Sequence, residues 1–233
     1  AAGALGASTP SAVLAAEQPN IDVYFGVGCF WHVQHEFIEA ERKILGRTDD
    51  TITSLAGYAG GKTTGKNPTM PGSKGVVCYH NFQGIADYGK LGHGEVVSMK
   101  IPAEFVGDFA NQYFALMDRN GDRPDKGDLG GEYRSLVGLP GGMSGPYYDA
   151  VKQAADAKGV SLVAGKGNDG DNLFKKSVWV YDTAAFPSYQ AEVYHQYHDG
   201  FAFGEDYPKS YNNLRDKFVN AGTLDSTGCP DIV

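Results

Sequence analysis

The residue best placed for chemistry in this chain is Cys29. It follows Gly28 at the end of an apolar stretch, residues 21–27, and it begins a segment whose apolar side chains recur at steps of three and four. A thiol in the first turn of a helix faces unpaired backbone N–H groups and the positive end of the helix dipole, which favour a thiolate. The position predicts a nucleophilic thiol, with a buried core cysteine as the alternative.

The other two cysteines are Cys78 and Cys229. An odd number of three excludes a disulfide framework and a four-cysteine metal site, and leaves open a second thiol that meets Cys29 during turnover. Cys78 lies in an apolar stretch, residues 76–79, and is expected to be a core residue. Cys229 lies in a segment flanked by Gly228 and Pro230 near the end of the chain.

Six segments, including the one around Cys29, resemble those of a known family. They are Gly28-Cys29-Phe30-Trp31, Gly57-Tyr58-Ala59-Gly60-Gly61, Asn67-Pro68-Thr69, Gly92-His93-Gly94-Glu95-Val96-Val97, Asp128-Leu129-Gly130-Gly131-Glu132-Tyr133-Arg134-Ser135 and Ala191-Glu192-Val193-Tyr194-His195-Gln196. In type and order they are similar to the motifs of the A-type peptide methionine sulfoxide reductases. A single motif is weak evidence, but six in one order over residues 28–196 make chance an improbable explanation.

The resemblance implies an oxidoreductase that acts on a sulfur group with a disulfide as acceptor, reducing methionine-S-sulfoxide, free or protein-bound, to methionine. Cys29 then attacks the sulfoxide sulfur and becomes a sulfenic acid. Glu95 donates a proton to the oxygen, which requires burial to raise its pKa. Tyr133 hydrogen-bonds the same oxygen, and Asp128 orients donors or polarises a water molecule.

The resemblance also implies the rest of the site. The expected substrate-binding residues are Phe30, Trp31, Tyr58 and His195, and neither a metal nor a cofactor is expected. Cys229 is expected to be the resolving thiol that condenses with the sulfenic acid into an intramolecular disulfide. Thioredoxin or an equivalent dithiol would then reduce that disulfide.

The chain departs from the family pattern at several positions. Met70 stands where the family usually has a tyrosine that binds the sulfoxide oxygen, and Tyr58 or Tyr79 is a possible substitute. The connection at residues 71–91 is longer than usual and carries three aromatic residues, Tyr79, Phe82 and Tyr88. We interpret it as an insertion beside the pocket, which would restrict the substrates that enter or form an interface.

Periodicity predicts an α+β fold, a single-domain two-layer sandwich of a mixed sheet with packed helices, and the resemblance implies a ferredoxin-like arrangement. The expected strands are residues 21–27, 51–55, 76–79, 95–101, 135–139, 160–163 and 177–181, and the expected helices are 29–45, 102–117, 146–158, 188–198 and 207–219. Residues 1–20 are expected to form a flexible arm. Residues 21–233 then form the catalytic domain, with the insertion near 71–91 and a mobile C-terminal tail.

Composition and charge limit the classes of partner that the protein is expected to bind. The net charge of −8 disfavours nucleic acid and anionic membranes as ligands. No apolar run approaches the ~20 residues of a membrane-spanning helix, so no membrane insertion is expected. The small, polar residues 1–20 resemble the remnant of a cleaved targeting segment, which suggests an organelle such as a plastid, with the cytoplasm as the alternative.

Other readings remain open at this stage. His32 and His35, and again His195 and His198, have the i, i+3 spacing of zinc ligands, but no third ligand is evident and hydrogen-bonded histidines are favoured. The acidic loop 118–122 begins like a calcium loop and departs from it at Arg123. A catalytically altered family member, acting as a binding or structural subunit of a larger assembly, is the main alternative function. A thiol peroxidase is another.

Overall fold

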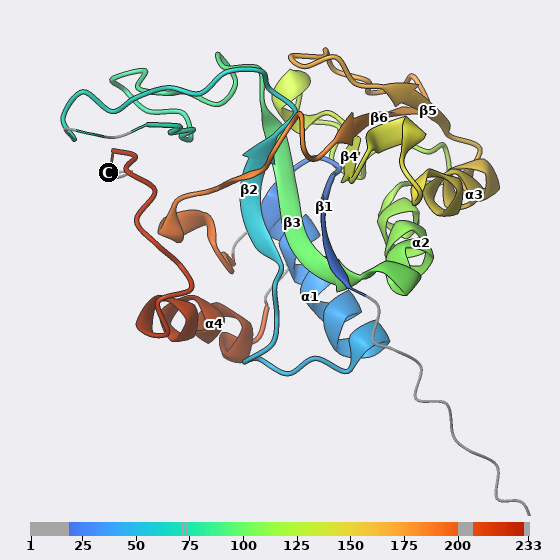
Figure 1. The fold of residues 1–233 in the computed structure, drawn as a ribbon, viewed down its shortest axis with the longest axis horizontal. Coiled ribbons are helices and arrows are strands. Elements are labelled where there is room, and N and C mark those ends of the chain that lie inside the picture. Colours follow the sequence, from blue (N-terminus) through green and yellow to red (C-terminus); the bar gives the residue numbers. More distant parts are fainter. Residues whose placement is uncertain (1–18, 71, 73, 200–206, 231–233) are drawn as a thin grey trace, which may run out of the picture.

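The computed structural model describes residues 19–70, 72, 74–199 and 207–230. A seven-stranded mixed sheet with the order β5-β6-β4-β1-β3-β2-β7 forms its centre (Figure 1). The strands are β1 (Asn20–Gly26), β2 (Leu55–Ala59), β3 (Gly94–Pro102), β4 (Leu136–Leu139), β5 (Ser161–Ala164), β6 (Ser177–Asp182) and β7 (Tyr189–Gln190). The helices are α1 (Phe30–Leu45), α2 (Val106–Leu116), α3 (Tyr148–Lys158) and α4 (Lys209–Asn220).

The four central strands confirm the ferredoxin-like arrangement. Neighbours in the order β4-β1-β3-β2 are all antiparallel, and α1 connects β1 to β2 while α2 connects β3 to β4. This is the split βαβ pattern. Strands β6 and β5 extend the sheet in parallel beyond β4, and β7 pairs antiparallel with β2 at the other edge. The expected two-layer α+β fold is therefore confirmed.

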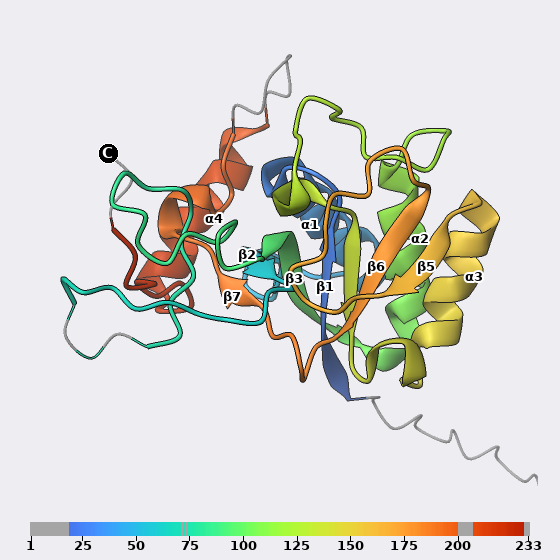
Figure 2. The same cartoon turned by 90° about the horizontal axis from the view of Figure 1, so that it is seen from above.

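Helix α1 owes its place to its apolar stripe. Val33 and Phe37 are fully buried on the sheet side, in one core with Phe25 of β1 and Phe109 of α2. The rings of Phe25 and Phe37 stack at 4.9 Å. Helices α2 and α3 lie side by side next to β5 and β6 (Figures 1 and 2). Burial of this stripe fixes the direction of α1 and therefore the position of its first turn, which Cys29 precedes.

Helix α4 packs on one flank of α1, next to the stripe that faces the sheet. Tyr211, Leu214 and Phe218 of α4 form a second buried cluster with Ile38 of α1 and with Tyr197. Helix α1 is therefore held from two sides. No helix in the described part of the chain is long and apolar enough to cross a membrane.

Most of the expected elements are confirmed within a few residues, and three are wrong. Residues 51–54 precede β2, and the strand runs through Gly57, where a Cβ would lie 2.5 Å from the backbone oxygen of Tyr189. Glycine here permits the close approach of β7. Residues 76–79 form isolated bridges from Val76 and Cys78 to other loop residues instead of a regular strand.

The expected helix at 188–198 is also wrong. The segment pairs with β2 as β7 and then forms a 3-10 turn, Val193–His195. The buried Gln196 side chain accepts a hydrogen bond from the Ala56 amide at 2.9 Å and donates to the Ala56 carbonyl at 2.8 Å. A side chain that pairs with a strand in this way holds the segment extended, so tertiary contacts outweigh helical periodicity.

The chain ends bear on the expected arm and tail. Residues 1–18 lie outside the described residues, and Asn20, the last residue of the expected arm, begins β1. Residues 231–233 lie outside them too. The C-terminal segment that is described lies next to residues 65–91 in both views (Figures 1 and 2), and the Asn67 side chain donates a hydrogen bond to the Gly228 carbonyl at 2.8 Å.

Candidate active site

Cys29 stands where β1 turns into α1. Gly28 makes this turn with φ of 86°, a backbone conformation that other residues rarely adopt. The Gly28 amide donates a hydrogen bond to the Tyr133 carbonyl at 3.2 Å, which brings the 3-10 turn Gly131–Tyr133 next to the thiol. Cys29 is the N-cap residue of α1 and is half-buried. The expected geometry, a thiol at the N-terminus of a helix, is therefore present.

The expected electrostatic consequence, a lowered thiol pKa that favours the thiolate, is wrong. Burial raises the pKa of Cys29 well above its ordinary value, and the nearby Glu95 carboxylate raises it further. Backbone amides of Trp31 and His32 oppose this shift but are outweighed. Cys29 is a thiol here because loss of hydration exceeds the stabilisation by the first helical turn.

Glu95 is the buried acid of this region. It lies at the start of β3 with 2% of its surface exposed. One carboxyl oxygen, Oε2, accepts a hydrogen bond from the Phe30 amide at 2.9 Å, and Oε1 accepts one from the Tyr88 hydroxyl at 3.2 Å. Burial raises its pKa to about 8, against these two hydrogen bonds. Glu95 therefore holds a proton near neutral pH, and it is hydrogen-bonded to the amide of Phe30, the residue that follows Cys29.

Tyr133 and Asp128 face the same place. Burial raises the pKa of the half-buried Tyr133 hydroxyl, and the Glu95 carboxylate raises it further. Burial likewise raises the pKa of Asp128, and Asp128 acts electrostatically on Cys29 and Glu95. Its Oδ2 is buried without a hydrogen-bond partner in the described part of the chain. The four predicted catalytic groups Cys29, Glu95, Asp128 and Tyr133 thus converge.

Aromatic rings surround these groups. The Trp31 indole N–H donates to His195 Nδ1 at 3.3 Å, and the His195 ring lies 5.2 Å from Phe30 and 4.4 Å from Tyr79. Phe30 is buried, whereas Trp31 and Tyr79 are partly exposed. Trp31 and Tyr79 therefore offer the accessible apolar surface, and the buried rings of Phe30 and His195 pack behind it.

Tyr58 lies in a different position from the one expected for a substrate ligand. It is fully buried, its ring stacks on Tyr88 at 4.7 Å, and its hydroxyl donates to Glu192 Oε2 at 2.8 Å. Its hydroxyl is thus engaged by a carboxylate behind the site. Of the two tyrosines considered as replacements at Met70, only Tyr79 is partly exposed beside Cys29.

The insertion is part of the site. Tyr88 donates to Glu95, and burial with the charge of Glu95 raises the pKa of Tyr79 to about 12. Sequence reasoning missed Tyr88, although the aromatic content of residues 71–91 was a usable signal. Neither Cys78 nor Glu192 was assigned a chemical role, since each depends on contacts between distant segments.

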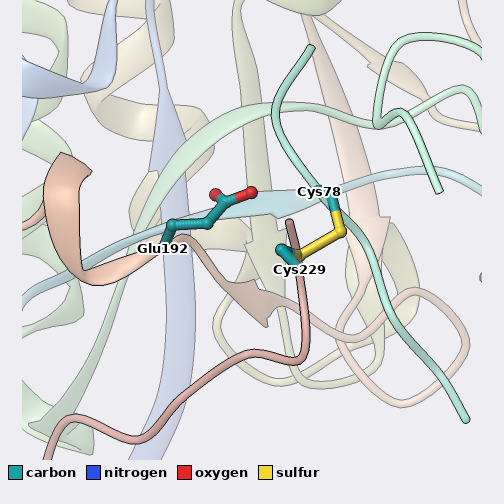
Figure 3. Close-up of side chains that lie close together, drawn as sticks. All are labelled: Cys78, Glu192 and Cys229. Atoms are coloured by element: carbon teal, nitrogen blue, oxygen red, sulfur yellow. A yellow bond between two sulfur atoms is a disulfide. The ribbon is translucent and has the colours of Figure 1, made fainter. Parts of the chain in front are cut away.

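Cys78 and Cys229 form a disulfide across a sequence separation of 151, with their Cα atoms 5.6 Å apart. Cys78 is fully buried, as expected for a core residue, and the disulfide is an additional feature that its apolar neighbours did not indicate. Cys29 is the free cysteine. Figure 3 shows the Glu192 carboxyl group beside the disulfide, and one of its oxygens lies within 4.8 Å of both sulfur atoms. Cys229 is thus joined to Cys78, whereas the expected partner was Cys29.

The histidine pairs do not assemble a metal site in the described part of the chain. The only group there of three or more His, Cys, Asp or Glu close enough for a metal is Cys78, Glu192 and Cys229, and its two sulfurs are bonded to each other. His35 stacks on Tyr207 at 3.8 Å, and His198 on Trp31 at 3.9 Å. These rings are packing partners.

A curated relative matches part of the chain. It is the peptide methionine sulfoxide reductase MsrA of Geobacter sulfurreducens, 32% identical over 120 residues, which are 48% of this chain and 57% of that protein. The resemblance to the A-type methionine sulfoxide reductases is confirmed. The chain spans a little over half the length of this relative. No protein-family model matches the chain.

Two solved structures are similar to the chain. Reduced Mxr1 of Saccharomyces cerevisiae has 20% identity and a TM-score of 0.48, over 81% of this chain and 92% of that one. Methionine sulfoxide reductase A of Corynebacterium diphtheriae has 16% identity and a TM-score of 0.45, over 83% and 85%. The fold assignment above therefore rests on the strand order itself.

Proposed function

We propose that the protein reduces methionine sulfoxide to methionine with Cys29 as the nucleophile and Glu95 as the proton donor. The observation that carries this proposal is the hydrogen bond from the Phe30 amide to Glu95. It holds a buried acid with a pKa of about 8 next to the residue that follows the thiol. A sulfoxide oxygen leaves only when protonated, so an acid and a thiol side by side suit this substrate.

The oxygen transfer balances without another reagent. The Cys29 sulfur bonds to the sulfoxide sulfur while Glu95 protonates the oxygen. The substrate S–O bond and the newly formed S–S bond then break as the hydroxyl group moves to the Cys29 sulfur, so the thiol is oxidised to a sulfenic acid and the sulfoxide is reduced to a thioether. The Cys29 proton replaces the one lost by Glu95. Protonated Glu95 also removes the charge that raises the Cys29 pKa.

Tyr79 and Tyr133 supply the remaining hydrogen bonds to the oxygen. Both hydroxyls remain protonated at neutral pH because burial and Glu95 raise their pKa values. Tyr79 takes the place of the tyrosine that the family carries where this chain has Met70. The S-methyl group then rests on Trp31, and specificity for the S epimer is proposed from the family resemblance.

The disulfide supports a route for recycling. A Cys229 thiol condenses with the Cys29 sulfenic acid, forming Cys29–Cys229 and releasing water. Cys78 then attacks the Cys229 sulfur, which frees the Cys29 thiol and leaves Cys78–Cys229, the disulfide of the present structure. Thioredoxin or an equivalent dithiol reduces this bond and is itself oxidised to a disulfide. Cys229 keeps the resolving role, and Cys78 gains a role of its own.

Turnover of a methionine-S-sulfoxide peptide with dithiothreitol tests the proposal. Cys29→Ser is expected to show no turnover, and Glu95→Gln to turn over about hundredfold more slowly, the lower end of the contribution of a positioned acid. Glu104→Gln, which removes an exposed carboxylate that follows β3, is the control and keeps its rate. Undiminished turnover by Cys29→Ser contradicts the proposal, and peroxide reduction at a comparable rate favours a thiol peroxidase. The binding-subunit alternative predicts no turnover in any form of the protein.

A further inference from the structure

The disulfide presents its two sulfur atoms unequally. Cys78 is completely buried, whereas Cys229 is partly exposed. A surface cavity of about 330 Å³ is lined by Glu192, Tyr194, Thr227 and Cys229 among others, and Cys78 is not among its lining residues. An external thiolate therefore reaches Cys229, and Cys78 is the leaving group of the exchange.

A buried leaving thiolate is unfavourable. Burial without a cationic partner raises the pKa of a thiol, and a thiol of high pKa leaves slowly in disulfide exchange. Among the His, Cys, Asp and Glu side chains of the described part of the chain, the group of close ligand atoms around Cys78 contains no His. The polar side chain that does lie there is Glu192. Cleavage of the disulfide thus calls for a proton at the Cys78 sulfur.

Glu192 is held in position to supply that proton. Oε1 accepts a hydrogen bond from the Tyr79 amide at 2.8 Å, and Oε2 accepts one from the Tyr58 hydroxyl at 2.8 Å. Only 9% of Glu192 is exposed. The titratable groups that face it are Tyr58, Cys78 and Cys229, and burial raises the pKa of Glu192 against its three hydrogen bonds, from its own amide, the Tyr79 amide and Tyr58. The Tyr58 hydroxyl can rotate to accept a hydrogen bond from the protonated form.

We propose that Glu192 donates a proton to the Cys78 sulfur when the Cys78–Cys229 disulfide is cleaved and takes it back when that disulfide forms. In cleavage, a reductant thiolate bonds to the Cys229 sulfur, the S–S bond breaks, and its electron pair stays on Cys78. The Glu192 carboxylic acid then protonates Cys78 and becomes a carboxylate. The second thiol of the dithiol reductant releases Cys229 and completes the oxidation of the reductant.

The distances suit this transfer. One Glu192 oxygen lies within 4.8 Å of both sulfurs while the S–S bond holds them, and cleavage frees the Cys78 side chain to rotate into hydrogen-bond distance. In the opposite direction, the Glu192 carboxylate removes the Cys78 proton before Cys78 attacks Cys229. Glu192 thereby acts on the recycling half of the proposed function, and this inference rests on that proposal only for its place in the cycle.

Reduction of the full-length disulfide protein by dithiothreitol, without any sulfoxide, tests the inference. Peptide mass spectrometry after timed alkylation follows the labels on Cys78 and Cys229, and each rate is divided by the concentration of dithiothreitol thiolate. The normalised wild-type rate is expected to fall as pH rises through the pKa of Glu192. Glu192→Gln is expected to be about hundredfold slower at low pH and independent of pH. Glu192→Asp is expected to restore the pH dependence in part.

Asp225→Asn is the matched control, because it removes an exposed carboxylate from the same C-terminal segment; it keeps the wild-type profile. A wild-type profile in Glu192→Gln, or an equal change in Asp225→Asn, overturns the inference. If Glu192→Gln does not fold, a Tyr58→Phe variant tests the inference instead. Loss of the Tyr58 hydrogen bond raises the pKa of Glu192, so the rate profile is expected to shift to higher pH. An unshifted profile overturns the inference. No sulfoxide is involved, so failure of the proposed function leaves this result interpretable.

Discussion

At the scale of single residues, burial is the strongest electrostatic influence on the site. Cys29 has the helix position that lowers a thiol pKa, yet its pKa is raised because burial and Glu95 outweigh two backbone amides. Glu95 keeps a pKa of about 8 despite accepting two hydrogen bonds. Burial therefore favours the protonated, uncharged form of both side chains.

This balance predicts a pH-dependent cost in stability from Glu95. A carboxyl group with a pKa of about 8 when folded and 4.5 when unfolded binds its proton more tightly in the folded state. It contributes no cost below the unfolded value, an increasing cost as pH rises from there, and the full cost above about pH 8. At about 1.4 kcal/mol per pKa unit, that cost is on the order of several kcal/mol.

Glu95→Gln carries no charge and should lack this decline. Urea denaturation at about pH 5 and about pH 9 measures the difference, and the free energy of unfolding of the variant relative to wild type is expected to rise between them. Glu104→Gln, which removes an exposed carboxylate, serves as the control. An equal pH dependence in Glu95→Gln and wild type would show that Glu95 ionises normally in the folded protein.

At the scale of elements, the segment at residues 74–91, part of the expected insertion, contributes side chains to the candidate site. It places Tyr88 on Glu95, Tyr79 beside Cys29, and Cys78 against Cys229. The tip of the insertion is different, because Phe82 is fully exposed. One side of this segment therefore forms part of the site, and its tip projects into solvent.

Tyr79→Phe tests this view of the insertion. It keeps the ring that packs on His195 and removes the hydroxyl, so oxygen transfer in a single turnover is expected to slow by about tenfold, the effect of 1.4 kcal/mol in the barrier. Rapid quenching with chromatographic measurement of methionine gives that rate. Phe82→Ala should leave it unchanged. A Tyr79→Phe rate equal to wild type would return the oxygen-binding role to Tyr133 and Glu95 alone.

Sequence reasoning succeeds where short-range patterns decide structure. The stripe of α1 and the Gly-Cys turn are local, and both are present as predicted. It fails for residues 188–198, because the Gln196 side chain pairs with Ala56 far away in sequence. It also misses the disulfide of Cys78, whose apolar neighbours predict a core residue while its partner lies 151 residues away. Pairings over such distances leave no periodic signal in one sequence.

At the scale of the whole molecule, the disulfide joins two segments that lie outside the sheet. Cys78 belongs to the insertion, and Cys229 follows α4, which packs on α1 through its own buried cluster. The main core is built from the sheet with α1, α2 and α3 and also takes in Val77 and Tyr88, but it includes neither cysteine of the pair. Opening the disulfide should therefore loosen the chain around Cys78 and Cys229 and leave the sheet folded.

Replacing both cysteines, Cys78→Ser with Cys229→Ser, tests this division. Closing a loop of 151 residues restricts the unfolded chain by about 5 kcal/mol in the chain-entropy account, so the double variant should lose up to that amount in urea denaturation and still fold. Hydrogen exchange monitored by mass spectrometry should rise in residues 74–91 and 221–230 and remain unchanged in β1, β3 and α1. Rapid exchange in β1 and β3 would mean that the disulfide supports the core itself. The recycling route would then require the enzyme to unfold in every cycle, and the role of Cys78 in it would have to be abandoned.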